Sequence, residues 1–349
     1  MSDTPMRFEQ YRRRFEPAIR RTIEQVAEQG GLGKSSLGRM LGYQMDTGGK
    51  RIRAVLPLMV AEALGEDPES MVAFGACCEL IHNATLVHDD LQDGDRVRRG
   101  EPTVWVKFGS AEAINLGDAM LMLAPRCLEH VDVEEALRWR ISHRIARRVL
   151  DVVAGQQQEF ELTVDAATLQ RYEQMVAGKT SGLFALPMVE TARLCGADEA
   201  VVHGLEEAAH PLGVLFQIQD DILDLYGQKG RGRRGEDIRE GKISALVVAF
   251  VQKGSDEDVQ RLTAILQADR DETTDEDVRW ASQVFRRDNA VDEAIDRIVD
   301  LRDQALGAEG LQDHLRLRGL IEEICDVVVE PIADVCDGSP FAESEGRQS

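Results

Sequence analysis

Two short segments of the chain combine closely spaced aspartates in a way that could hold a divalent metal ion. Each contains Asp-Asp-x-x-Asp, formed by Asp89, Asp90 and Asp93 in LVHDDLQD and by Asp220, Asp221 and Asp224 in FQIQDDILD. On a helix, residues four apart share a face, so these carboxylates repel one another unless a cation neutralises them. Oxygen ligands without His or Cys favour Mg²⁺, with Mn²⁺ as the alternative, and Mg²⁺ usually binds one or two carboxylates together with phosphate oxygens. The pair of motifs predicts a diphosphate held between two facing helices.

Basic residues accompany both aspartate motifs. They are Lys50 and Arg53 in GGKRIR, Arg98 and Arg99 after the first motif, Lys179 in GKTSGLF, and Arg233 and Lys242 after the second motif. Lys50 and Arg53 lie near the start of an expected helix, where backbone N–H groups also favour anions. A single aspartate motif could be a solvated acidic surface, but two motifs with several separated cations fit two diphosphate groups better.

Helical periodicity dominates the segments that must position these residues. Apolar residues recur at spacings of three and four over 8–28, 50–64, 68–92, 109–130, 133–162, 166–194 and 197–226. Strand-like alternation is almost absent, and Pro68 and Pro211 are expected at helix starts. No linker or regular repeat interrupts the chain. We therefore expect one all-α domain over residues 1–337, with the motifs within 45–250 and a flexible tail at 338–349.

Composition excludes several classes of function. A hydrophobic content of 43% in 349 residues is enough for a substantial core, and a net charge of -22 argues against nucleic acid as a partner. No apolar run is long enough for a transmembrane segment, and the N-terminus has no apolar core typical of a signal peptide. The six cysteines show no metal-binding or disulfide spacing, so reduced thiols in a cytoplasmic protein are expected.

Taken in order, the motifs resemble those of the trans-type polyprenyl (isoprenyl) diphosphate synthases, with geranylgeranyl diphosphate synthase-like members as the nearest type. The matching segments are GGKRIR, IHNATLVHDDLQD, RRGEPTVW, GKTSGLF, FQIQDDILD and GEDIREGK. The resemblance implies an all-α isoprenoid synthase type I helical bundle around a deep central cavity, usually in a homodimer. It also implies a prenyltransferase that condenses isopentenyl diphosphate with dimethylallyl, geranyl or farnesyl diphosphate. Three Mg²⁺ ions are expected with substrate bound.

The resemblance also implies a role for each site residue. The expected metal ligands are Asp89, Asp93 and Asp220, with Asp90 supporting and Asp221 and Asp224 nearby. The positions expected to hold isopentenyl diphosphate are Lys50, Arg53, His82 and Arg99. Those expected to hold the allylic diphosphate are Arg98, Lys179 and Lys242, while Thr180 and Gln217 line the reaction centre. The expected catalytic set is Asp89, Asp90, Asp93, Lys179, Thr180, Gln217 and Asp220.

Some positions depart from the family pattern, and others could have a structural rather than a functional role. The family usually has a lysine before the Gly-x-Asp segment, and here Arg233 or Arg231 is expected to replace it. His82 could instead be a buried helical histidine. Asp95 and Arg96 match no functional position, so we expect them in a solvated loop.

Product length is expected to depend on the helix before the first motif. In the family, side chains four and five positions before Asp89 often form the floor of the chain pocket, and here they are the small Thr85 and Ala84, with Ile81 deeper. We therefore expect C20 geranylgeranyl diphosphate or a longer product and disfavour C15. One alternative is a class I terpene cyclase, which typically has one aspartate motif plus an Asn/Ser/Glu metal triad. Another is a non-catalytic subunit of a heteromeric prenyl synthase, which usually loses a metal motif.

Overall fold

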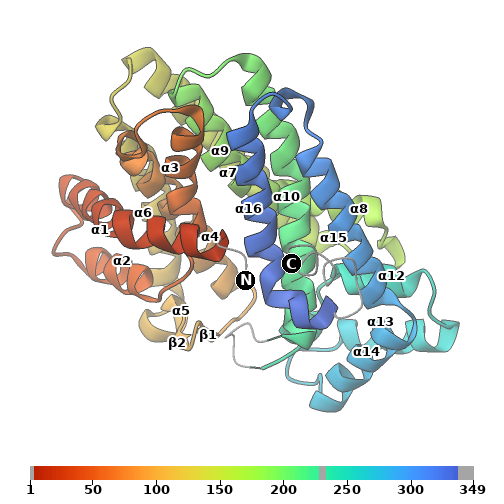
Figure 1. Ribbon diagram of the computed structural model, residues 1–349. Coiled ribbons are helices and arrows are strands. Elements are labelled where there is room, and N and C mark those ends of the chain that lie inside the picture. Colours follow the sequence, from red (N-terminus) through yellow and green to blue (C-terminus); the bar gives the residue numbers. More distant parts are fainter. Residues whose placement is uncertain (1–3, 228–232, 337–349) are drawn as a thin grey trace.

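The computed structural model describes residues 4–227 and 233–336, which are almost entirely helical (Figure 1). The long helices are α1 (Thr4–Gln29), α3 (Ile52–Leu64), α4 (Val72–Gln92), α6 (Ser110–Leu123), α7 (Glu135–Glu161), α9 (Gly182–Leu194), α10 (Glu199–Tyr226), α15 (Ala290–Leu306) and α16 (Leu315–Val329). The shorter ones are α2 (Ser36–Asp46), α5 (Val104–Phe108), α8 (Leu169–Val176), α11 (Glu236–Arg239), α12 (Ala245–Val251), α13 (Asp256–Gln267) and α14 (Asp275–Arg287). Strands β1 (Val97–Arg98) and β2 (Glu101–Pro102) pair as one small antiparallel hairpin. The all-α prediction is confirmed.

Short turns of other helical types link these elements. The 3₁₀ turns are Pro68–Met71, Ala124–His130, Val164–Ala166, Glu309–Leu311 and Glu330–Cys336, and a π-helical turn covers Ala177–Ser181. Pro68 begins one of these turns, as predicted for a helix start. Pro211 lies inside α10 instead, so that prediction is wrong. Because α10 is buried along most of its length, its packing outweighs the one backbone hydrogen bond that proline removes.

Helix α10 occupies the centre of the bundle and packs against α9, α15, α16, α8 and α12 (Figure 1). A second group of helices packs around α4, which contacts α1, α3, α6 and α9. Each group has its own cluster of buried apolar side chains, one centred on α10 and one on α4. Since α3 and α9 contribute to both clusters, the two groups share one continuous core.

The five cysteines whose side chains the structure describes are free thiols, as predicted: Cys77, Cys78, Cys127, Cys195 and Cys325. One helical segment, Pro68–Gln92, is long and apolar enough to cross a membrane, but 72% of its apolar window is buried inside the protein. It is therefore a core helix of the bundle. The predicted single domain ending at residue 337 stays a prediction, because the tail 338–349 lies outside the described residues.

Glycines bring the π-helical turn Ala177–Ser181 into close contact with two helices. A Cβ atom at Gly155 of α7 would lie 2.2 Å from the backbone nitrogen of Lys179, and one at Gly213 of α10 would lie 2.3 Å from Cα of Ser181. No side chain fits in either gap. The turn is therefore fixed between α7 and α10, with Lys179 and Thr180 at its centre. Single π-helical turns inside helices are frequent at functional sites.

Candidate active site

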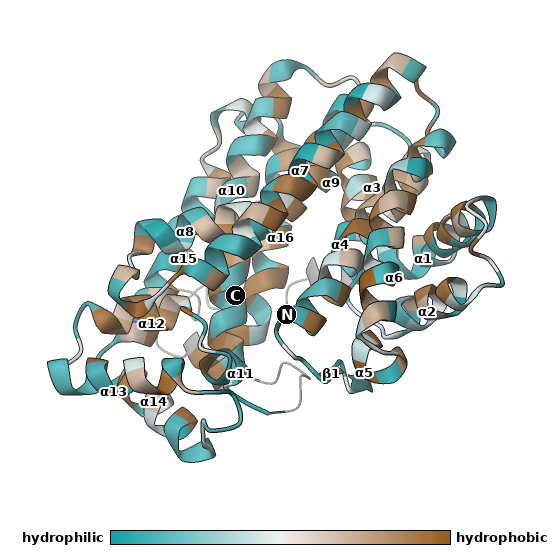
Figure 2. Ribbon diagram, turned by 180° about the vertical axis from the view of Figure 1, so that it is seen from behind, coloured by the Kyte–Doolittle hydropathy of each residue, from teal (hydrophilic) through white to brown (hydrophobic). Residues whose placement is uncertain are grey.

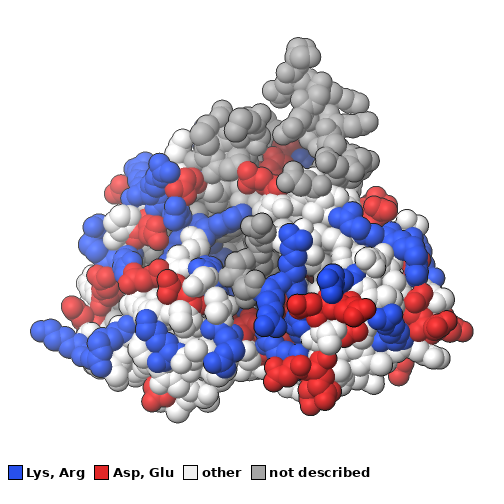
Figure 3. All heavy atoms as spheres, turned by 90° about the horizontal axis from the view of Figure 1, so that it is seen from below, with Lys and Arg blue, Asp and Glu red and all other residues white. Residues whose placement is uncertain are grey.

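Two adjoining cavities lie at the end of the bundle where α4, α7 and α10 finish and α3 and α9 begin. Seen from this side, the molecule has Lys and Arg side chains interspersed with Asp and Glu (Figure 3). We call the first the carboxylate cavity; its acidic and lysine side chains are Asp89, Asp93, Glu159, Lys179, Asp220, Asp221, Asp237 and Lys242. We call the second the basic cavity; its charged side chains and histidine are Lys50, Arg51, Arg53, Glu79, His82, Arg98, Arg99 and Asp220. The shared lining residues are Arg53, His82, Leu86, Arg98, Phe216 and Asp220.

The first aspartate motif divides between the carboxylate cavity and a buried ion pair. Asp89 and Asp93, one turn apart on α4, both line the cavity. Burial raises the pKa of Asp89, an effect that nearby Lys179 opposes and Asp93 reinforces. Asp90 is buried and pairs with Arg98 at 2.5 Å instead. This pair anchors the arginine that borders both cavities, and the expected supporting role of Asp90 in metal binding stays a prediction.

The second aspartate motif divides in a similar way. Asp220 borders both cavities, whereas both oxygens of Asp221 accept hydrogen bonds: Oδ2 from the Tyr172 hydroxyl at 2.8 Å and the Ala245 backbone at 2.7 Å, and Oδ1 from Gln217 at 3.0 Å. Asp224 accepts a hydrogen bond from the backbone of Asp237 at 3.2 Å. Asp221 and Asp224 thus fasten the segment around α11 and the start of α12. Their expected part in metal binding stays a prediction.

Two lysines reach into the carboxylate cavity, and both are paired with carboxylates. Lys179 contacts Glu159 at 2.5 Å, and Lys242 contacts Asp93 and Glu240, each at 2.7 Å. Burial lowers the pKa of each lysine, but the surrounding carboxylates outweigh burial and the net pKa is raised for both. Both ammonium groups are therefore charged at neutral pH. Glu159 was missed in the sequence, because its contact with Lys179 joins α7 to the π-helical turn and no local pattern indicates it.

A chain of hydrogen bonds crosses the reaction centre that the sequence predicts. The hydroxyl of Thr180 donates to Oε1 of Gln217 at 3.1 Å, and the amide of Gln217 donates to Asp221. Tyr172, which the sequence did not single out, donates to the same carboxylate. These hydrogen bonds fix the orientation of the Gln217 amide, with its oxygen toward Thr180 and its nitrogen toward Asp221.

The basic cavity contains two buried nitrogens that lack hydrogen-bond partners in the part of the chain that is described: Nε of Arg53 and Nδ1 of His82. Burial lowers the pKa of Arg53 to about 10, so its guanidinium remains charged, and it lies 5.0 Å from the Phe184 ring and 5.2 Å from the Phe216 ring. Burial and the neighbouring Arg53 lower the pKa of His82 well below its usual 6.5, which makes it neutral. Unpartnered nitrogens beside several cations fit an anionic ligand.

The remaining basic residues of the predicted site do not all line the same cavity. Lys50 and Arg99 line the basic cavity, and Arg99 donates to the backbone oxygen of Gly48. Arg98 borders both cavities rather than the carboxylate cavity alone. Arg233 is exposed and lines neither cavity, and Arg231 lies outside the described residues, so the proposed replacement of the family lysine stays a prediction.

Apolar side chains line the remaining wall of the carboxylate cavity: Leu86, Val152, Met175, Leu183 and Ile243. Thr85 joins this wall, and its hydroxyl donates to the backbone oxygen of His82 at 2.8 Å. Ala84 and Ile81 lie in the buried cluster around α4 and do not line the cavity. Their expected part in the floor stays a prediction.

The solvated-loop prediction for Asp95 is wrong. Asp95 is 3% exposed, its carboxylate pairs with Arg270 at 3.1 Å, and its backbone oxygen accepts hydrogen bonds from Thr103 and Trp105, each at 2.7 Å. The sequence could not indicate this because Arg270 is far away along the chain. Arg96 is exposed, as predicted.

A helical bundle in which two aspartate motifs face one cavity, beside a second cavity lined by cations, defines the class of protein: an enzyme of the isoprenoid synthase fold. Comparison with known proteins gives the family. The family model described as polyprenyl synthetase matches residues 34–284, and the chain belongs to this family. It is a trans-prenyltransferase.

Individual relatives agree with this assignment. A geranylgeranyl diphosphate synthase of Mycobacterium tuberculosis is 34% identical over 266 residues, which is 72% of this chain and 73% of the relative. A farnesyl diphosphate synthase of Geobacillus stearothermophilus is 36% identical over 219 residues, 61% of this chain and 72% of the relative.

Two solved structures have the same fold. Geranylgeranyl pyrophosphate synthetase from Pyrococcus horikoshii is 27% identical, with a TM-score of 0.77 and coverage of 91% of this chain and 97% of that one. Geranylgeranyl pyrophosphate synthase from Corynebacterium glutamicum, complexed with isoprenyl diphosphate and magnesium, is 24% identical, with a TM-score of 0.77 and coverage of 91% and 98%. These structures confirm the predicted isoprenoid synthase bundle.

Proposed function

We propose that this prenyltransferase joins isopentenyl diphosphate head to tail to an allylic diphosphate, with dimethylallyl, geranyl and farnesyl diphosphates as candidate primers. The observation that carries the proposal is the wall shared by the two cavities. An allylic diphosphate among Asp89, Lys179 and Lys242 and an isopentenyl diphosphate in the basic cavity would meet at this wall. Their diphosphates would occupy separate cationic sites, while their reacting carbons lie together.

The acidic side chains of the carboxylate cavity suit a divalent cation bound together with a diphosphate. Among residues 4–227 and 233–336, no three His, Cys, Asp or Glu side chains are arranged to hold a metal ion by themselves. Sites completed by phosphate oxygens are typical of Mg²⁺. We assign Asp89, Asp93 and Asp220 as ligands, with Asp221 and Asp224 as further candidates, for three Mg²⁺ ions, with Mn²⁺ as the alternative ion. When bound, the metal neutralises diphosphate charge and so improves the leaving group.

The chain's own residues would supply the rest of the chemistry. The charged Lys179 and Lys242, with Arg98, stabilise negative charge on the departing diphosphate as the allylic carbon–oxygen bond breaks. The isopentenyl double bond then attacks the allylic cation, and the proton is lost to the released diphosphate. Thr180 and Gln217 present oriented dipoles at this centre. The apolar wall excludes water, which would convert the cation to an alcohol.

Two alternatives fit the structure less well. A class I terpene cyclase would not need the basic cavity, in which Lys50, Arg53, His82 and Arg99 lie together. A non-catalytic subunit would not need aspartates of both motifs in one cavity, yet Asp89, Asp93 and Asp220 meet there.

For the product we propose C20 geranylgeranyl diphosphate, with longer chains as the alternative. The support is the small Thr85 on the apolar wall, where a bulky residue would shorten the space for a growing chain. Relatives named for both C15 and C20 products lie at similar identity, so the comparisons do not decide between the two.

We also propose a homodimer in the cytoplasm. Large apolar side chains are exposed on α6 and α7: Ile114, Met122, Trp139, Leu150, Val153 and Phe160. The four on α7 recur on one face of that helix, which crosses the near side of the molecule in Figure 2. A second copy of the chain is the occupant that the family resemblance implies. The free cysteines support a cytoplasmic location.

Two matched variants test the assignment of the two diphosphate sites. Lys50→Ala should raise the KM for isopentenyl diphosphate about tenfold or more and leave the KM for the allylic primer nearly unchanged. Lys179→Ala should raise the KM for the primer and lower kcat. Steady-state kinetics with each substrate varied in turn provides the measurement. An equal effect of both variants on both KM values would contradict two separate sites.

A further inference from the structure

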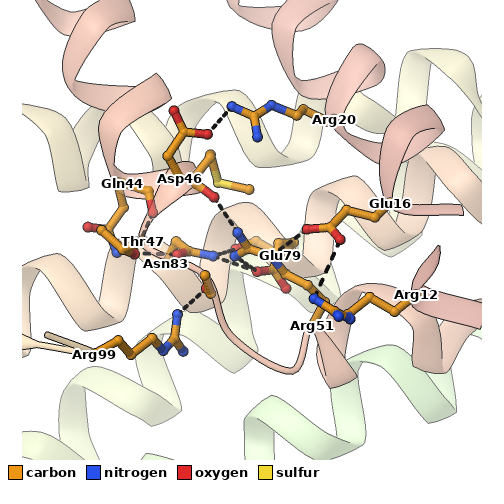
Figure 4. Close-up of polar contacts among 12 residues, drawn as sticks. Arg12, Glu16, Arg20, Gln44, Asp46, Thr47, Arg51, Glu79, Asn83 and Arg99 are labelled. Atoms are coloured by element: carbon orange, nitrogen blue, oxygen red, sulfur yellow. Dashed lines mark hydrogen bonds and ion pairs between the residues drawn. The ribbon is translucent and has the colours of Figure 1, made fainter. Parts of the chain in front are cut away.

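A buried arginine lies between two residues assigned to the isopentenyl diphosphate site. Arg51 is flanked by Lys50 and Arg53 in the chain, and its side chain is 5% exposed. It donates to Oε1 of Glu79 on α4 at 2.7 Å, to Glu16 on α1 at 3.2 Å and to the backbone oxygen of Met45 at the end of α2. Figure 4 shows Arg51 between Glu16 and Glu79. One side chain thus ties the start of α3 to three other helices.

Glu79 is the centre of this network. Its Oε1 accepts hydrogen bonds from Arg51 and, at 2.8 Å, from Asn83. Asn83 in turn accepts a hydrogen bond from Gln44 at 3.2 Å, and all three of Glu79, Asn83 and Gln44 are at most 2% exposed (Figure 4). Glu79 also lines the basic cavity, and its Oε2 has no hydrogen-bond partner in the described part of the chain.

The backbone of Arg51 explains why such an anchor is needed. Its φ is +54°, a left-handed conformation that non-glycine residues seldom adopt, and Arg99 across the cavity has a φ of +55°. Residues held in this region persist only where the surrounding structure fixes them. At Arg51 the conformation turns the chain from the Gly48-Gly49-Lys50 segment into α3. The directions of Lys50 and Arg53 therefore depend on the anchored Arg51.

Glu79 also opposes the repulsion among the cations of the basic cavity. Its negative charge favours the charged form of Arg53, whose pKa is lowered first by burial, and Arg99 lines the same cavity. Without a bound anion, Lys50, Arg51, Arg53 and Arg99 would otherwise repel one another.

We propose that Arg51 and Glu79 are positioning residues that set the affinity for isopentenyl diphosphate by holding Lys50 and Arg53 in place. The inference rests on the proposed assignment of the basic cavity. Arg51 fixes the backbone between the two cations that contact the diphosphate, and Glu79 fixes Arg51.

The test is a comparison of KM values in the full-length enzyme. Glu79→Gln keeps the size of the side chain but removes its charge and leaves Arg51 without its buried counter-charge. We expect the KM for isopentenyl diphosphate to rise at least tenfold, with the KM for the allylic primer and kcat within about twofold of wild type. Arg20→Gln is the matched control, because its ion pair with Asp46 joins α1 to α2 on the exposed surface, outside the basic cavity.

A double variant separates positioning from simple stability. In Arg51→Met/Glu79→Leu the buried pair is replaced by apolar side chains, an exchange that often leaves stability intact. We expect its melting temperature to lie near that of wild type, while its KM for isopentenyl diphosphate stays raised. A double variant with wild-type KM would overturn the proposal.

Other outcomes are equally decisive. A lower KM for isopentenyl diphosphate in Glu79→Gln would mean that Glu79 repels the substrate rather than positioning its site. An equal rise in both KM values with a fall in melting temperature would mean a merely structural role. If wild type itself fails to elongate any primer, the proposed function fails first; calorimetric binding of isopentenyl diphosphate to wild type and Glu79→Gln then tests the positioning role alone. Equal affinities would refute it.

Discussion

At the scale of single residues, the aspartates of the two motifs differ in what their carboxylates contact, although Asp221 lines the carboxylate cavity together with Asp89, Asp93 and Asp220. Asp89, Asp93 and Asp220 border the cavity, and Asp93 also pairs with Lys242. Asp90 instead pairs with Arg98, and Asp221 accepts three hydrogen bonds. The family resemblance already separated Asp89, Asp93 and Asp220, as expected ligands, from the supporting or nearby Asp90, Asp221 and Asp224. The sequence could not show what holds Asp221, because Tyr172 and Ala245 belong to other helices.

This division predicts different consequences for two neighbouring substitutions. Asp220→Asn should lower kcat at least about a hundredfold, since an amide is a poor ligand for Mg²⁺ and leaves diphosphate charge uncompensated. Asp221→Asn should cost about 1–3 kcal/mol of unfolding free energy, because it weakens hydrogen bonds to buried groups. Steady-state kinetics and denaturant unfolding of both variants provide the measurement. A fully active Asp220→Asn enzyme would refute the assignment of this residue to metal binding.

At the scale of secondary-structure elements, the π-helical turn is the feature that places Lys179 and Thr180. Periodicity predicted a single helix over 166–194, and the structure has α8, the π-helical turn and α9 instead. The other six predicted ranges agree to within a few residues with helices of the structure and the 3₁₀ turns that adjoin them, because amphipathic periodicity reflects burial directly. The turn was not predicted, because it depends on the gaps at Gly155 and Gly213, which belong to other helices.

Because Gly155 lies so close to the π-helical turn, a substitution there tests whether the position of the turn matters for activity. Gly155→Ala would put a methyl group 2.2 Å from the backbone of Lys179, so the turn must shift. We expect kcat to fall at least about tenfold and stability to fall by about 1–3 kcal/mol, as is usual for overpacking. Gly42→Ala on α2 is the matched control, since nothing lies within 4 Å of its added methyl group. Its stability should stay the same or rise by up to about 1 kcal/mol. Equal activity of the two variants would show that the turn tolerates displacement.

The wall formed by α4 offers a prediction about product length. Thr85→Phe places an aromatic ring on the apolar side of the carboxylate cavity, where we propose that the growing chain extends. We expect the main product to shorten from C20 to C15, because the chain meets the ring sooner. Chromatographic sizing of dephosphorylated products provides the measurement. An unchanged length distribution would mean that the floor lies on another helix.

At the scale of the whole molecule, one buried carboxylate opposes stability and has no place in the proposed reaction. Glu190 on α9 is 1% exposed, and neither of its oxygens has a hydrogen-bond partner in the described part of the chain. Its nearest cations, Arg193 and Arg144, are 3.7 Å and 3.8 Å away. Burial raises the pKa of Glu190 above its ordinary value of 4.5, with the arginines opposing.

The raised pKa gives stability a defined pH dependence. The folded protein binds the Glu190 proton more tightly than the unfolded chain, so this group's contribution is greatest below pH 4.5 and is lost as pH rises through the folded pKa. Glu190→Gln should therefore raise the unfolding free energy at pH 8 by about 1 kcal/mol and flatten its dependence on pH. Denaturant unfolding of both proteins at several pH values provides the measurement. If the unfolding free energies of the two proteins depended on pH in parallel, Glu190 would not be the source of this pH dependence.

Some features of the fold and of the candidate site could be predicted from the sequence, and others are known only from the structure. The fold class could be predicted from helical periodicity, and the meeting of Asp89, Asp220, Lys179 and Lys242 from the resemblance of the motifs to those of the family. The division into two cavities, the Glu159 partner of Lys179 and the Arg51–Glu79 pair could not be predicted, because each depends on side-chain contacts between different helices.

The reaction itself is the most direct test of the proposed condensation of isopentenyl diphosphate with an allylic diphosphate. Purified protein is incubated with labelled isopentenyl diphosphate, Mg²⁺ and each of dimethylallyl, geranyl and farnesyl diphosphate, and the products are sized. We expect elongation that stops when the metal is chelated, with a C20 product. A C15 endpoint would contradict the proposed product length alone. No elongation with any primer would contradict the proposed condensation.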